Sequence, residues 1–206
     1  MRIKAKRSFT QRMALTLGLL AVWSGACAGY KFMRAFEPLL IRSLAIDAQY
    51  IEFEESLPNN KHWQENMSIL KGMAQEKSGL LEKLKTLSPP APEQDLYNTL
   101  IEDLNNSVSY LDSETNFFHK NTEYGLWLAN MIYEGMEKAT PETRTAWANA
   151  KAEVLRLQAE MTAAADKCNS SQAKLAKLVV EKNLRRRPQP IKYAKYQRDH
   201  VGYKMK

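Results

Sequence analysis

Residues 140–182 have the sequence TPETRTAWANAKAEVLRLQAEMTAAADKCNSSQAKLAKLVVEK. Thr140 supplies a helix N-cap, Pro141 suits the first helical position, and Glu142 places a carboxylate near the positive end of the helix dipole. Apolar or small side chains then recur every seven residues in two rows, Trp147, Val154, Met161, Cys168 and Leu175, and Ala150, Leu157, Ala164, Ser171 and Leu178. Five repeats in register predict one long helix with a coiled-coil-like seam, on the order of 60 Å in length.

The residues before this helix also show helical periodicity and no alternating stretch long enough for a strand. We expect a first helix from near Pro38 to Glu55, unless it begins earlier, a second between the breaks at 58–60 and 88–92, and a third from Glu93 to about Phe118. Short connections favour antiparallel neighbours. The predicted fold class is all-α: an up-and-down helical bundle of four or five helices, with a long C-terminal coiled-coil-like helix and a basic, irregular tail. The C-terminal half of the long helix is predicted to project from the bundle or to meet a second chain.

Residues 124–133, YGLWLANMIY, form a distinctive predicted helix of their own. They are apolar on nearly every face, and Asn130 is their only strongly polar side chain. The stretch is too short to span a membrane. We expect a central helix that its neighbours bury; the alternative is a segment that docks on a membrane surface or on a partner.

Charge divides the chain into three parts. Residues 1–12 hold five Lys or Arg and no acid, and residues 185–206 hold eight Lys or Arg against the single Asp199. The chain has a net charge of +7, so the region between its two basic ends is mildly acidic. We predict a signal peptide or N-terminal membrane anchor at 1–28, a helical bundle at 29–184, and a basic, Tyr-containing tail at 185–206.

The N-terminal segment has the order of a secretory signal. Cationic residues precede an uncharged run from Met13 to Trp23, and Ala26-Cys27-Ala28 fits a small-x-small cleavage site. The predicted localisation is extracytoplasmic, in the periplasm or attached to the outer face of the inner membrane. Three alternatives remain open. Continued to about Tyr30, before Lys31, the apolar run reaches the lower limit of about 18 residues for an uncleaved anchor. Cys27 suits a bacterial lipoprotein, and the absence of acids before Glu37 suits a mitochondrial presequence.

The sequence contains no motif that indicates catalysis. It has no phosphate-binding Gly-rich loop, nucleophile elbow or haem-attachment motif. His62, His119 and His200 lie in different segments, and Cys168 lies in a heptad row, where we expect it to act as a small buried hydrophobe. We therefore predict no enzyme activity, no cofactor and no metal.

The C-terminal tail is the predicted partner-binding segment. Pro188 and Pro190 end the long helix, and the following residues interleave cations with Tyr. Cations attract carboxylate or phosphate surfaces, and Tyr rings add flat amphipathic area. The predicted contact residues are Arg185, Arg186, Arg187, Lys192, Tyr193, Lys195, Tyr196, Arg198, Tyr203 and Lys204. The expected partner is a protein or an anionic envelope surface, with nucleic acid less favoured; a solvated end that binds nothing is the alternative.

Together these features predict a non-enzymatic structural or interaction protein of an envelope or membrane-associated assembly. It would dock through its long helix and its basic tail, and an uncleaved N-terminal segment would hold it at the membrane. The alternative function is that of a helical-bundle sensor, or a module that binds a small apolar ligand around residues 124–133. The sequence identifies no small-molecule substrate.

Export is directly testable. Because the cationic, apolar and small-residue regions occur in the required order, we expect N-terminal sequencing of the mature protein to begin near Gly29. An intact Met1 terminus on a cytosolic protein would contradict the signal and anchor interpretations alike.

Overall fold

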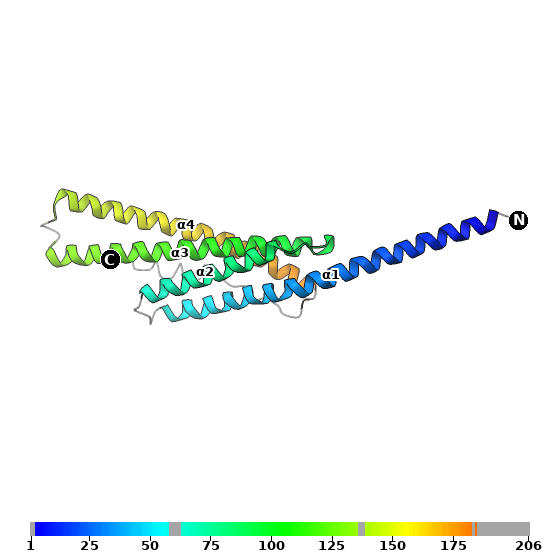
Figure 1. Cartoon of the computed structure of the whole chain (residues 1–206). Coiled ribbons are helices and arrows are strands. Elements are labelled where there is room, and N and C mark those ends of the chain that lie inside the picture. The colour runs from blue at the N-terminus through cyan, green and yellow to red at the C-terminus, as the bar shows by residue number, and fades with distance from the viewer. Residues whose placement is uncertain (1–2, 58–62, 136–138, 183, 185–206) are drawn as a thin grey trace.

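The protein is all-helical over the residues that the computed structural model describes, which are 3–57, 63–135, 139–182 and 184. This part of the chain contains no strand. Its elements are four long helices and one short 3-10 helix: α1 (Ile3–Ser56), α2 (Trp63–Lys85), η2 (Ala91–Glu93), α3 (Gln94–Glu134) and α4 (Pro141–Glu181) (Figure 1). The all-α prediction is confirmed, and adjacent helices pack as in a bundle.

Two predicted helix boundaries differ from the structure. α1 runs through Pro38 and extends far upstream of it. The predicted third helix and the separate helix at 124–133 form one element, α3, because no proline lies between them and Gly125 alone costs only about 1 kcal/mol relative to Ala. α3 ends at Gly135, where φ is +87°, a left-handed conformation that glycine adopts without a steric penalty.

No helix in the described part of the chain combines the length and the apolar character needed to cross a membrane.

The core consists of two apolar clusters, one above the other along the bundle axis. The first joins all four helices through residues such as Phe36, Leu84, Leu100 and Leu175. The second does the same through residues that include Phe53, Leu70, Leu111 and Met161. Along each helix, the residues of one cluster precede those of the other.

A polar layer lies between the two apolar clusters. Lys77 of α2 forms an ion pair with Asp47 of α1, and both side chains are fully buried. The Lys77 ammonium also donates to Ser43 Oγ at 3.5 Å. Ser171 Oγ of α4 donates to Asp103 Oδ1 of α3 at 3.0 Å. Burial raises the pKa of Asp103 to about 7. All four helices thus contribute to one buried polar level.

A second polar group surrounds Tyr50 within the second cluster. The Tyr50 hydroxyl lies 2.7 Å from the Tyr110 hydroxyl, 2.5 Å from Glu54 Oε1 and 2.9 Å from Glu114 Oε2. Burial raises the pKa of Glu54 to about 7, and burial together with the negative charge of Glu54 raises the pKa of Glu114 to about 8. Because its pKa is raised to about 8, Glu114 is largely protonated near neutral pH.

The raised pKa values predict a pH-dependent stability. Glu54, Asp103 and Glu114 hold protons in the folded state at pH values where the unfolded chain has lost them. The free energy of unfolding should therefore fall as the pH rises from about 4 to about 8, and level off above that range. Glu114→Gln stays neutral at every pH and should reduce the fall.

Urea unfolding at about pH 5 and about pH 8 measures this effect. Glu65→Gln, at an exposed position of α2, is the control and should follow the parent. A Glu114→Gln profile parallel to that of the parent would show that burial of Glu114 does not control the dependence.

Candidate docking surface

The α3–α4 hairpin extends beyond the ends of α1 and α2 (Figure 1). Leu57, next to the end of α1, packs with Phe117 and Phe118 of α3 against the second apolar cluster. On α4, none of the described residues before Leu157 is buried. We call residues 119–134 of α3 and 141–156 of α4 the tip.

The tip exposes the apolar stretch that was predicted to be a buried central helix, and that prediction is wrong. Leu126 is 61% exposed, Trp127 47%, Ile132 64% and Tyr133 93%. Only Tyr124 and Met131 of the stretch are buried, and the Tyr124 ring stacks on Trp147 of α4 with a centroid distance of 6.1 Å. The physical reason is that, among the described elements, α4 alone lies alongside the stretch, and a single neighbour covers one side of an all-apolar helix.

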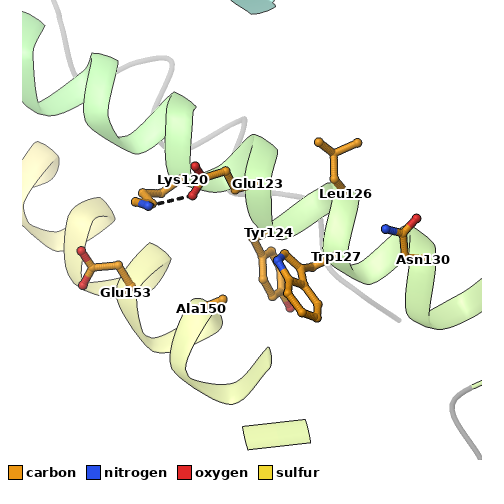
Figure 2. A pocket seen from close by; sticks show the side chains of 8 residues that line it. All are labelled: Lys120, Glu123, Tyr124, Leu126, Trp127, Asn130, Ala150 and Glu153. Carbon is orange, nitrogen blue, oxygen red and sulfur yellow. Dashed lines mark hydrogen bonds and ion pairs between the residues drawn. The ribbon is translucent and has the colours of Figure 1, made fainter. Parts of the chain in front are cut away.

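Apart from Trp127, the large exposed apolar side chains of the stretch lie on one side of α3. Gly125, Leu126, Ala129, Ile132 and Tyr133 follow the spacing of one helical face. We call these five residues the tip face. Figure 2 shows Leu126 pointing away from α4, whereas Tyr124 and Trp127 lie on the side of α4.

Rows of residues seven apart show how the tip differs from the body of the bundle. The row that packs inward in the body contains Leu104 and Leu111, which are 0% and 1% exposed, and it continues into the tip as Ile132. A neighbouring row is exposed in the body and polar, with Asn105, Asp112 and His119. It continues into the tip as Leu126 and Tyr133, which are exposed but apolar. The row that is buried in the body is therefore exposed in the tip, and the row that faces solvent in the body becomes apolar in the tip.

An open depression of about 530 Å³ lies beside the tip face, and Leu126 belongs to both (Figure 2). Tyr124, Leu126 and Trp127 contribute most of its apolar lining, and Lys120 donates to Glu123 Oε2 across 2.7 Å at its edge. That hydrogen bond lowers the pKa of Glu123. Glu153 of α4 adds a second carboxylate. An open, charged depression fits a side chain of a partner better than it encloses a small apolar molecule.

The residues predicted to bind a partner lie outside the described part of the chain. These are Arg185, Arg186, Arg187, Lys192, Tyr193, Lys195, Tyr196, Arg198, Tyr203 and Lys204. The long helix also departs from expectation. Its N-terminal half, not its C-terminal half, projects, because Leu175 and Val179 near its end belong to the first apolar cluster.

Cys168 is buried, as predicted. Its thiol lies 3.4 Å from Ser107 Oγ, and burial raises its pKa to about 12. His119 is exposed, and its Nε2 lies 3.1 Å from Glu123 Oε1, while His62 and His200 fall outside the described residues. Within the described residues, no three His, Cys, Asp or Glu side chains are grouped to hold a metal ion.

The buried acids are a second set of residues with perturbed pKa values, which is a common property of functional sites. Asp103 and Glu114 are enclosed by the bundle core, and their partners are the neighbouring helices. The contacts of Asp103 and Glu114 with the neighbouring helices account for their raised pKa values as a result of core packing. The tip face is therefore the better candidate site.

Comparison with known proteins adds no assignment. No protein-family model matches the chain, and searches of curated proteins and of solved structures find no match.

The exposure of the tip predicts opposite outcomes for the same substitution at two positions of α3. Leu126→Ala should change the free energy of unfolding by no more than about 0.5 kcal/mol, because the side chain has few contacts to lose. Leu111→Ala should cost about 2–5 kcal/mol by leaving a cavity in the core. Urea unfolding at low protein concentration measures both, and equal losses would mean that Leu126 is buried.

Proposed function

We propose that the protein is a non-enzymatic interaction component of an envelope or membrane-associated assembly. The observation that carries this proposal is the tip face, an uncovered apolar surface at the end of the bundle. Monomeric soluble proteins rarely expose adjoining large apolar side chains without a binding role. Exposure of Ile132 and Tyr133 together is hard to account for by packing within the chain.

The shape of the molecule supports a role in reaching a distant partner. The N-terminus of α1 and the tip lie at opposite ends of the molecule (Figure 1). α1 beyond residue 28 and the tip together extend on the order of 65 Å at about 1.5 Å per residue. If residues 1–28 direct the chain to a membrane, as a signal peptide or as an anchor, the body lies outside the cytoplasm. An anchored chain then presents the tip far from the lipid surface.

The long helix and the tail complete the proposal. In the tip, Trp147, Ala150 and Val154 of α4 are only partly buried, so a further helix packing there would extend the coiled-coil-like seam. The basic residues of 185–206 form a second attachment to an acidic protein or an anionic envelope surface. Salt should weaken that attachment, because exposed charges are screened over about 8 Å at physiological ionic strength.

A ligand-binding role is the second candidate. The depression beside Tyr124 and Trp127 favours it, since aromatic rings line many small-molecule sites. Lys120, Glu123 and Glu153 make the same depression charged and open. The interaction role therefore ranks first.

Site-specific photocrosslinking in the native cells tests the interaction role. We expect a photoreactive residue in place of Tyr133 to give discrete adducts with protein. The matched control is the same residue in place of Asp112, an exposed position on the same row of α3 in the body, which should give none. Equal labelling at the two positions, or none at either, would remove the tip face as a docking surface.

A further inference from the structure

In the described part of the chain, the tip consists of α3 and α4 alone, whereas the body of the bundle also contains α1 and α2. In the body, α1 and α2 cover the row of α3 that contains Leu104 and Leu111, and both apolar clusters include residues of α1 and α2. The same row is uncovered at Ile132. The surface that continues the row can therefore receive a helix, because helices cover the row in the body.

The geometry points to a second copy of this chain as the occupant: two tip faces pair antiparallel, α3 against α3. This inference rests on the proposed function and names the partner of the same surface. The reason is the distribution of side-chain sizes along the face, which begins at Gly125 with no side chain, continues through Leu126 and Ala129, and ends at the large Ile132 and Tyr133.

Antiparallel pairing centred on Ala129 places the largest side chain of the face, Tyr133, opposite Gly125, which has none. Tyr133 is four residues after Ala129, and Gly125 is four residues before it. Each Tyr133 ring therefore lies over Gly125 of the second copy, and each Ile132 lies near Leu126 of the second copy. The same patch contacts itself, as twofold symmetry requires.

Gly125 leaves room for this arrangement, and the exposed Gly72 and Gly79 of α2 are equally free of contacts within 4 Å. A Cβ atom added at Gly125 would meet nothing within 4 Å, so no contact within the chain requires glycine. Glycine is among the weakest helix formers, yet it occupies an exposed position inside α3. Because Gly125 has no side chain, a ring from a second copy can approach the helix backbone there.

The charges of the tip are balanced and do not oppose self-association. The tip contains four cations and four carboxylates, which are Lys120, Arg144, Lys151 and Arg156, and Glu123, Glu134, Glu142 and Glu153. Several of these pair locally, including Lys120 with Glu123 and Arg156 with Glu153, each at 2.7 Å. A polyanionic partner would favour a net positive surface, which the tip does not have.

The size of the face sets the expected affinity. From Gly125 to Tyr133 it is only about 12 Å long and one helix wide. Stable complexes bury about 800 Å² per partner, and this face offers less, so the dimer is expected to be weak and to depend on concentration.

Disulfide trapping tests the arrangement in the full chain. Ala129→Cys places a thiol on the proposed twofold axis, in a Cys27→Ser background; Cys168 is buried and does not compete. Mild oxidation should convert Ala129→Cys to a disulfide-linked dimer. Asp112→Cys, exposed on α3 in the body, should stay monomeric. Adding Gly125→Trp fills the space at Gly125 that the Tyr133 ring of the second copy would occupy, and it should lower the dimer yield at least about tenfold. Circular dichroism checks that the helices remain.

Sedimentation equilibrium of the unmodified protein is the second measurement. A concentration-dependent dimer that Gly125→Trp abolishes supports the pairing. A parent that stays monomeric at about 100 µM, or equal trapping at positions 112 and 129, overturns it. If that parent still gives tip-specific adducts with another protein in cells, the second-copy inference fails and the proposed function stands. If dimers form but are the only adducts, the pairing stands and the assembly role fails.

Discussion

The arrangement of the four helices depends on one buried ion pair, between Lys77 of α2 and Asp47 of α1. A buried ammonium without its carboxylate costs several kcal/mol, so sliding α2 along α1 by one turn would place Lys77 in an apolar cluster at that cost. Asp103 and Ser171 bring α3 and α4 to the same level. A buried pair of this kind adds little net stability. Its consequence here is a single alignment of the helices.

Once that level is set, helix length decides which surfaces are covered. From the polar layer towards the tip, α1 continues for nine residues, from Asp47 to Ser56, and α2 for 14, from Lys77 to Trp63. α3 continues for 31 residues beyond Asp103 and α4 for 30 beyond Ser171. At about 1.5 Å per residue, the second pair reaches roughly 25–30 Å further than the first. That difference in length produces the tip and leaves its apolar face without cover.

The molecule thus buries charge in its body and exposes apolar side chains at its tip. Each feature is unfavourable for an isolated chain, since burial of charge and hydration of apolar surface both cost free energy. The two features have a common explanation if the body serves to hold the tip face in place. The polar layer aligns the long α3–α4 hairpin, and the hairpin presents Ile132 and Tyr133 to another helix at the end of the bundle opposite the N-terminus.

The sequence by itself determined the all-helical class, the cap and start of α4 at Thr140 and Pro141, and the burial of Cys168, because these follow from local spacing and side-chain type. It did not determine the exposure of residues 124–133. Apolar periodicity shows that one face of a helix is suited to burial, but the residues that would bury it are distant in the sequence. How far α1 and α2 reach along α3 depends on the register in which the helices pack. The sequence does contain one sign of a docking surface, because a row of residues seven apart changes from polar to apolar. The polar members are Asn105, Asp112 and His119, and the apolar members are Leu126 and Tyr133. Only the tertiary structure decided that this surface is left open, because the Lys77–Asp47 pair sets the alignment and two helices then end before the other two.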